Sequence, residues 1–405
     1  MRFLTVLCSI CTILPVFAGP TSLPISVSID IFPGEKAAGH IVRLKDGASK
    51  ENVVREVVKL LFGKLGKLGI THEYECALNG FAGIFDPVTL AALQMMPGVA
   101  SISENGIVRT TETVTQSNAP WGLSRLSSAS FLPHEADPFG LDYSYAYDSK
   151  AGKDVDIYII DTGIRFSHKD FEGRARWAYT APTAVGLPTD GNGHGTHCAG
   201  TAAGTQYGVA KKAKLHGVKV LSDLGSGTTS DVISGMDFVL CERNKFGRPT
   251  VASMSLGGGI SPPLDAAAQK LVEGGVHLVV AAGNDNADAD ATSPAHVREA
   301  ITVGASNITD GRAYFSNYGP AVDVFAPGVN VTSAWNDSDN GTNTISGTSM
   351  ATPHIAGLVA YLLSLGDSTM TPAAMSQWIK DLALKGILND IPSGTTNILA
   401  QNDLA

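Results

Sequence analysis

From Trp121 onward, short apolar segments alternate with segments of helical periodicity, and this alternation constrains the fold more than any other feature. The apolar runs are Asp156–Ile160, Leu215–Leu221, Val251–Leu256, Val276–Ala282 and Ala300–Val303, and the helical stretches lie near residues 196–204, 229–243, 263–273, 348–365 and 371–385. Strands that are apolar throughout are typical of parallel sheets covered by helices on both faces. The sequence therefore predicts an α/β fold of three layers with a mostly parallel central sheet. In such a sheet, chemistry is expected at the carboxyl ends of the strands.

A different pattern precedes it, between residues 19 and 113. The stretches His40–Lys45, Ala82–Phe85 and Val99–Ser103 read as strands, and Lys50–Leu65 and Pro87–Met96 as helices. This predicts a small α+β domain of the βαββαβ, or ferredoxin-like, kind. The polar stretch Thr110–Asn118 lacks periodicity and is predicted to be an exposed linker.

The first eighteen residues have the features of a secretory signal peptide. Arg2 is followed by an apolar run from Phe3 to Phe17, and the small residue Ala18 ends a cleavage-site pattern. The run is too short to span a membrane, and no other stretch reaches spanning length. We therefore expect a signal peptide at 1–18, a first domain at 19–113 and a second at 114–405. We also expect an extracellular rather than a vacuolar destination and no membrane partner.

Composition excludes several classes of protein. The chain of 405 residues carries a formal net charge of -9 without a basic block, which argues against a nucleic-acid partner. After the signal segment only Cys76, Cys198 and Cys241 remain, too few for a disulfide-built scaffold. Candidate glycosylation sites begin at four Asn-x-Ser/Thr sequences: Asn307, Asn330, Asn336 and Asn340.

Two segments place an acid and a base at predicted strand and helix ends. Asp161 ends a buried strand, where a carboxylate is costly unless it is paired with a group such as an imidazolium. An ordinary turn residue is the alternative, and aspartic proteases need Asp-Thr-Gly twice whereas it occurs once here. His194 lies between Gly193 and Gly195 at a helix start. His197 follows it, but no Glu stands at the spacing of a His-Glu-x-x-His zinc site, so we interpret His194 as a general base with a pKa near the usual 6.5 or so.

Two further segments can supply a nucleophile and an oxyanion site. Ser349 lies in the predicted first turn of a buried helix, where unpaired N–H groups and the helix dipole can hold an anion. Asn284 follows an apolar strand and can donate its amide N–H to a developing oxyanion. Taken singly, these segments also read as a capped helix start and a turn.

Together the four segments resemble the subtilisin-like serine proteases of the peptidase S8 family, most of all the proteinase K subgroup. They are Asp-Thr-Gly at 161, Gly-His-Gly-Thr-His-Cys-Ala-Gly around 194, Ala-Ala-Gly-Asn at 281 and Gly-Thr-Ser-Met-Ala-Thr-Pro-His at 347. The resemblance covers about residues 114–405, while residues 20–113 resemble that family's inhibitor I9-like propeptide. It implies a subtilisin-like fold in which Ser349 is the nucleophile, His194 the general base and Asp161 the group that orients it. Asn284 would form the oxyanion hole.

The resemblance also implies how substrate binds. Extended substrate would pair with two edge segments and place its first side chain in a pocket with room for apolar or aromatic groups. The residues so implied are Gly225, Ser226, Gly227, Ser255, Leu256, Gly257, Ala281 and Gly283.

Cofactors and partners follow from the same resemblance. Catalysis needs no cofactor, and structural calcium would bind at Asp323 with backbone oxygens near Arg298 and Ala300. The subgroup's disulfides have no counterpart, because Asp156 and Ile301 occupy expected half-cystine positions. The partners would be protein and peptide substrates and the chain's own propeptide, which acts as chaperone and inhibitor of a monomeric enzyme.

The function expected is therefore that of a secreted serine endopeptidase of broad specificity, matured by autocatalytic removal of its propeptide. An α/β-hydrolase esterase would need Gly-x-Ser-x-Gly and the order Ser, Asp, His, and this chain has neither. The alternative from another class is a catalytically silent binding protein on the same fold. Such a protein would be expected to have lost Ser349, His194 or Asn284, and all three are present.

Overall fold

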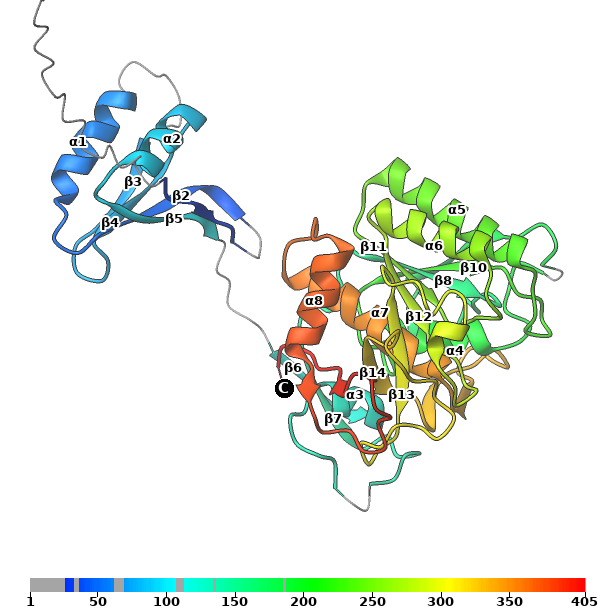
Figure 1. Cartoon of the computed structure of the whole chain (residues 1–405). Helices are drawn as coiled ribbons and strands as arrows, with labels where there is room; N and C mark the ends of the chain where they lie inside the picture. The colour runs from blue at the N-terminus through cyan, green and yellow to red at the C-terminus, as the bar shows by residue number, and fades with distance from the viewer. Residues whose placement is uncertain are drawn as a thin grey trace, which may run out of the picture. The chain divides into compact units, whose positions relative to one another are not determined.

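The computed structural model describes residues 26–32, 36–61, 69–106, 113–133, 136–184 and 187–404. The chain divides into two compact units, residues 1–108 and 109–405 (Figure 1). The proposed signal peptide at 1–18 lies outside the described residues, as does most of the segment in which we expect the propeptide to be cleaved.

The first unit is a small sheet carrying two helices. Its elements are β1 (Ile29–Asp30), β2 (Lys36–Leu44), α1 (Lys50–Leu61), β3 (Gly69–Tyr74), β4 (Gly80–Ile84), α2 (Pro87–Met95) and β5 (Val99–Gly106). The strands lie in the order β1-β5-β2-β4-β3, so β2 to β5 with their helices form the predicted βαββαβ unit. The sequence pattern did not locate β3, because its side chains are mostly exposed and give no apolar signal.

One face of this sheet forms the core of the first unit. Val42 and Leu44 stand two residues apart on β2 and are both buried, since alternate side chains of a strand share a face. Val57 of α1 and Leu93 of α2 pack in the same cluster. The helix α2 begins where Asp86 accepts a hydrogen bond from the N–H of Thr89 at 2.7 Å, which satisfies one of the free N–H groups of its first turn.

The second unit is built around a sheet of nine strands, and the pairs β6/β7 and β15/β16 form two small sheets of their own. The strands of the unit are β6 (Thr113–Ala119), β7 (Tyr143–Asp148), β8 (Asp156–Asp161), β9 (Ala175–Thr180), β10 (Lys214–Lys219), β11 (Thr250–Met254), β12 (His277–Ala281), β13 (Ile301–Ser306), β14 (Val324–Pro327), β15 (Val331–Ala334), β16 (Thr342–Ile345), β17 (Leu384–Lys385) and β18 (Ile398–Leu399). Its α-helices are α3 (Trp121–Leu126), α4 (His194–Ala203), α5 (Thr229–Phe246), α6 (Pro262–Glu273), α7 (Thr348–Leu365) and α8 (Pro372–Leu382). The sheet order is β17-β18-β14-β13-β12-β11-β8-β10-β9, parallel throughout except for β17 against β18.

Helices cover both faces of this sheet, as the apolar strands predict. Ile157 and Ile159 of β8 belong to the core cluster shared with α4 and α7. Tyr158 and Ile160, which point to the opposite face, belong to the cluster shared with α5 and α6 (Figure 1). The predicted three-layer α/β fold with a mostly parallel sheet is thus confirmed.

The helix α7 runs through the middle of the second unit. The expectation that no other stretch reaches spanning length was wrong, because α7 has the length and apolarity of a membrane span. However, 83% of that span is buried inside the protein, so α7 is a core helix. Its position matters because its first turn carries Thr348 and Ser349 at the carboxyl-terminal edge of the sheet.

The linker predicted over Thr110–Asn118 was wrong for the part that the structure describes. Thr113–Ala119 forms β6, which pairs with β7 in antiparallel register from Thr113 opposite Asp148. The strand is polar because much of it is exposed, and its side chains make polar contacts, such as Gln116 Nε2 to the carbonyl oxygen of Gln206 at 2.9 Å. Periodicity of apolar residues cannot reveal such a strand.

Candidate active site

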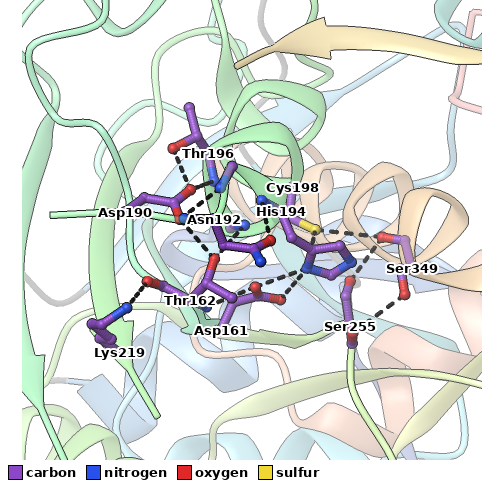
Figure 2. Close-up of polar contacts among 12 residues, drawn as sticks. Asp161, Thr162, Asp190, Asn192, His194, Thr196, Cys198, Lys219, Ser255 and Ser349 are labelled. Carbon is purple, nitrogen blue, oxygen red and sulfur yellow. Dashed lines mark hydrogen bonds and ion pairs between the residues drawn. The ribbon is translucent and has the colours of Figure 1, made fainter. Parts of the chain in front are cut away.

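An acid and a base meet at the carboxyl-terminal edge of the sheet. Asp161 is the last residue of β8 and is fully buried, and His194 is the first residue of α4. The Nδ1 atom of His194 lies 2.8 Å and 2.9 Å from the two carboxylate oxygens of Asp161 (Figure 2). A carboxylate accepts hydrogen bonds, so the proton of the neutral ring sits on Nδ1. The lone pair on Nε2 is then free to take up a proton.

Two glycines beside His194 allow its loop to approach β8 closely. Gly193 caps α4 with φ 106°, a left-handed conformation that glycine adopts without strain. A Cβ atom on Gly195 would lie 2.1 Å from the carbonyl oxygen of Gly163, which is closer than any contact permits. The Gly-His-Gly sequence is therefore a steric requirement for bringing the imidazole to Asp161.

Asp190 organises this loop, and the sequence pattern did not reveal it. Its buried carboxylate accepts hydrogen bonds from Thr162 Oγ1, from the N–H groups of Asn192, Gly193 and Thr196, and from Thr196 Oγ1, at 2.6–3.0 Å. It thereby joins the end of β8 to the start of α4 (Figure 2). The only hint in the sequence was an acidic residue four positions before His194 in a glycine-rich segment. Most of its hydrogen-bond donors are backbone N–H groups, which leave no pattern in the sequence.

Ser349 lies on the other side of the His194 ring from Asp161 (Figure 2). Its hydroxyl donates to the carbonyl oxygen of Ser255 at 3.2 Å, and its own carbonyl accepts from Ser255 Oγ at 2.8 Å and from Cys198 Sγ at 3.5 Å. To donate to Nε2 of His194, the hydroxyl must first leave the carbonyl oxygen of Ser255. Such contacts are often long without substrate and tighten when it binds.

Two N–H donors converge beside Ser349. Asn284 Oδ1 accepts hydrogen bonds from Thr348 N at 2.8 Å and Thr348 Oγ1 at 2.9 Å, which turns the amide Nδ2 away from Thr348. A methyl group placed on Gly347 would lie 3.5 Å from Ser349 N and 3.7 Å from Asn284 Nδ2. Both nitrogens therefore lie close to one point, and two N–H donors so placed are suited to hold an oxyanion.

Two pockets lie along a cleft through this site, on either side of the segment Ser255–Gly259. One, of about 520 Å³, is lined by His194 and by Gly225, Ser226, Gly227, Ser255, Leu256 and Gly257. The other, also of about 520 Å³, is lined by Asn284 and Ser349 and by Ser255, Leu256, Gly257, Ala281 and Gly283. The structure thus brings all eight residues predicted for substrate binding to one cleft.

The electrostatics of the two histidines differ. Burial is the largest single influence on the pKa of His194 and lowers it, but the Asp161 carboxylate and Cys198 together raise it, and the net pKa lies well above the usual value, higher than the sequence alone indicated. His197 is fully buried, which lowers its pKa to about 3, and its Nε2 lies 2.9 Å from the carbonyl oxygen of Val331. His197 is therefore a neutral core residue, in line with the argument against a zinc site there.

The residues around Asp323 do not fit the calcium expected from the sequence. Asp323 Oδ2 accepts a hydrogen bond from Thr302 N at 2.8 Å, and Oδ1 lies 2.7 Å from Lys380 Nζ. Calcium takes six to eight oxygen ligands, whereas an ammonium group already compensates this carboxylate. Asp323 is therefore the partner of a lysine in this structure, and that pairing does not fit a calcium ion at its carboxylate.

The described cysteines, Cys76, Cys198 and Cys241, are all free thiols. At the expected half-cystine position, Asp156 instead lies 2.5 Å from Arg248 Nε and 3.1 Å from His216 Nε2. Cys198 is buried, its Sγ lies 4.0 Å from His194 Nδ1, and burial raises the pKa of its thiol, so it stays neutral in the ordinary pH range.

Comparison with known proteins places this geometry in a family. A profile of the subtilase family matches residues 152–400, more than half of the chain, and one of peptidase inhibitor I9 matches residues 39–111. The chain belongs to the subtilase family. It is 46% identical over 393 residues to alkaline protease 2 of Aspergillus fumigatus, and this alignment covers 91% of this chain and 78% of that protein. It is 48% identical over 357 residues to the subtilisin-like serine protease Cur l 4.0101 of Cochliobolus lunatus, covering 82% and 69%.

A solved structure supports the same assignment. The crystal structure of a cold-adapted subtilisin-like serine proteinase matches with a TM-score of 0.65 and 46% identity, covering 71% of this chain and 99% of that one. This subtilase is accordingly a serine endopeptidase with an inhibitor I9 propeptide domain, and it acts on peptide bonds.

Proposed function

We propose that this subtilase is a secreted endopeptidase of broad specificity in which Ser349 is the nucleophile and His194 its general base. Asp161 orients the imidazole, and Asn284 with the backbone N–H of Ser349 stabilises the oxyanion. The observation that carries the proposal is the position of the His194 ring between the Asp161 carboxylate and Ser349. Asp161, His194 and Ser349 lie at the ends of β8, α4 and α7, which fix the positions of their backbones.

The chemistry follows from these positions. Ser349 Oγ attacks the scissile carbonyl carbon while its proton passes to His194 Nε2, and the resulting imidazolium is stabilised by Asp161. The two N–H donors hold the negative oxygen of the tetrahedral intermediate. His194 then gives the proton to the leaving amine, and a water molecule, activated in the same way, hydrolyses the acyl-enzyme.

We propose that substrates bind as extended strands and that the pocket beside Ser349 prefers apolar or aromatic P1 side chains. Leu256, Ala281 and Ala291 contribute apolar side chains to a lining that also includes polar groups, among them Asp285. Main-chain pairing along Ser255–Gly257 would recognise no particular sequence. The test is hydrolysis of peptide p-nitroanilides that differ only at P1. The proposal expects a higher kcat/KM for Phe and Leu than for Asp, and equal values would contradict it.

Replacement of Asn284 tests the oxyanion site. Asn284→Asp keeps an acceptor for the Thr348 N–H but replaces the amide donor, so kcat should fall about 100- to 1000-fold with little change in KM. Thr348→Ser, which keeps the backbone and the hydroxyl, is the matched control and should remain near wild type. An Asn284→Asp enzyme within a factor of a few of wild-type kcat would remove Asn284 from the oxyanion hole.

The pH profile tests the role of His194. Only neutral imidazole can accept the Ser349 proton, so kcat/KM should fall as pH drops through the pKa of His194. Because Asp161 raises that pKa, the midpoint of the acid limb should lie above the ordinary 6.5. Full activity retained at pH 5 would contradict a His194 base.

Secretion and glycosylation complete the proposal. Three of the four sequon asparagines are partly buried and already hydrogen-bonded: Asn336 Nδ2 donates to Asp190 O, while Asn307 and Asn330 accept through Oδ1. Asn340 is exposed. Of the four predicted sites, we therefore propose Asn340 as the one that carries a glycan on the folded, secreted, monomeric enzyme.

Stability should not depend on calcium at Asp323. A ligand at a hundred times its Kd stabilises the folded state by about 2.7 kcal/mol, so a calcium site there would make the wild type chelator-sensitive and the Asp323→Asn variant not. Because Lys380 supplies the cation, we expect a chelator to change Tm by the same amount in both proteins. Differential scanning calorimetry with and without chelator decides this. A chelator effect in the wild type that disappears in Asp323→Asn would restore the calcium site.

A further inference from the structure

The wall of the proposed P1 pocket has few side chains of its own to hold it. It consists largely of Gly257, Gly258 and Gly259, opposite Ala291 and Thr292. Glycines contribute no side-chain packing and have more backbone freedom than other residues. The width of the pocket therefore depends on whatever fixes this segment from outside.

Ser293, which does not line the pocket, holds the glycine segment Gly257–Gly259 in place. Gly258 N donates to Ser293 O at 3.0 Å, and Ser293 N donates to Gly258 O at 3.1 Å, an antiparallel bridge between the two walls. The Ser293 hydroxyl accepts from Ser261 N at 2.9 Å and donates to Asp265 Oδ2 at 3.0 Å. Ser293 is completely buried, so these contacts are shielded from water.

Asp265 in turn depends on His296. Asp265 lies in the first turn of α6, its side chain is 14% exposed, and its Oδ1 is buried without a hydrogen-bond partner. His296 Nε2 lies 2.8 Å from Asp265 Oδ2. Burying a carboxylate is costly unless a compensating group lies beside it, and His296 is the basic side chain that the described part of the chain places there. A series of contacts thus runs from His296 through Asp265 and Ser293 to Gly258, which lies in the wall of the pocket.

We propose that Asp265 and His296 are positioning residues for the P1 pocket. Together they hold Ser293, and through it the glycine wall, at the separation that a large P1 side chain requires. Neither residue lines the pocket, so their effect is on its shape and not on contact with substrate. This inference rests on the proposed role of that pocket as the P1 site.

The test compares two peptide p-nitroanilides that differ only in having Phe or Ala at P1. His296→Ala should raise KM for the Phe substrate about fivefold, the size expected for the loss of one polar contact, with a smaller change in kcat and in the Ala substrate. His296→Gln, whose amide N–H can donate to Asp265, should restore most of the Phe preference. Arg298→Ala is the matched control, because Arg298 lies on the same loop but pairs with the exposed side of Asp290.

A purely structural role for the pair predicts a different result. If His296→Ala lowers Tm but keeps the wild-type ratio of kcat/KM for Phe over Ala, the pair does not position the pocket and the inference is wrong. Equal losses on both substrates would also contradict it. If His296→Ala does not fold, the ratio measured for His296→Asn and His296→Gln decides. A wild-type enzyme without preference for Phe would instead contradict the proposed P1 pocket itself.

Discussion

Replacing Ser349 with alanine should lower kcat about a millionfold, the size of loss that removal of the nucleophile or base causes in subtilisin, a member of this family. His194→Ala should cost about as much, because Ser349 Oγ is a weak nucleophile unless a base removes its proton. Asp161→Asn should cost about a hundredfold less than either, since the base remains but its tautomer is no longer fixed. The measurement is kcat for a P1 Phe peptide p-nitroanilide, with each variant purified from a host free of contaminating proteases.

If the three residues act as one catalytic unit, the losses in kcat of the single variants will not add up in a double variant, whereas three independent contributions to kcat would add. The double variant Ser349→Ala/His194→Ala should be no slower than either single variant, because the second residue has no role once the first is gone. Asp190→Asn gives a useful contrast, since it disturbs the loop that holds His194 without touching substrate and should lower kcat far less. A Ser349→Ala enzyme with only a tenfold loss would show that another group is the nucleophile.

Ser349→Ala should also accumulate as an unprocessed precursor. The inhibitor I9 match ends at residue 111, and the second compact unit begins at residue 109. We propose self-cleavage within residues 109–115, after which the propeptide stays bound as an inhibitor until it is digested. The wild type should then begin near β6, whereas Ser349→Ala should keep the whole chain from about Gly19. Mass spectrometry of both proteins gives the two N-termini directly.

The contrary outcome for maturation is equally clear. If Ser349→Ala is still processed near Val114 in a host lacking other proteases, autocatalysis is wrong.

The physical reason to expect a separate folding partner is the topology of the second unit. Its parallel strands pair across long sequence separations, as β8 does with β10 and β11, and such sheets fold slowly. A preformed α+β domain can speed this step.

The sequence was informative where apolar periodicity or a dense motif encodes structure. Buried strands such as β8 and β12 are apolar at nearly every position, so their bounds were predicted within a residue or two. Asp161, His194, Asn284 and Ser349 were singled out because the four short motifs around them together resemble those of the subtilases, whereas each motif alone also reads as an ordinary turn or helix start.

What the sequence could not provide were contacts between distant polar residues. Asp323 meets Lys380, and Asp265 meets His296, only because the fold brings their segments together, and neither pairing leaves a local pattern. Asp190 was missed because its partners are largely backbone N–H groups, which every sequence has. The strand β6 was missed because an exposed, polar strand lacks the apolar alternation on which prediction depends.

The most direct test of the central claim is covalent labelling of the mature enzyme with a fluorophosphonate. The reagent phosphorylates a serine only where a base activates it and an oxyanion site holds the phosphoryl oxygen. We expect one label per chain, located by peptide mass spectrometry on Ser349, and labelling that is strongly slowed in His194→Ala although that variant is folded. A folded, processed wild-type chain that takes up no label, as a silent binding protein would, or that is labelled at another serine, would contradict the proposed mechanism.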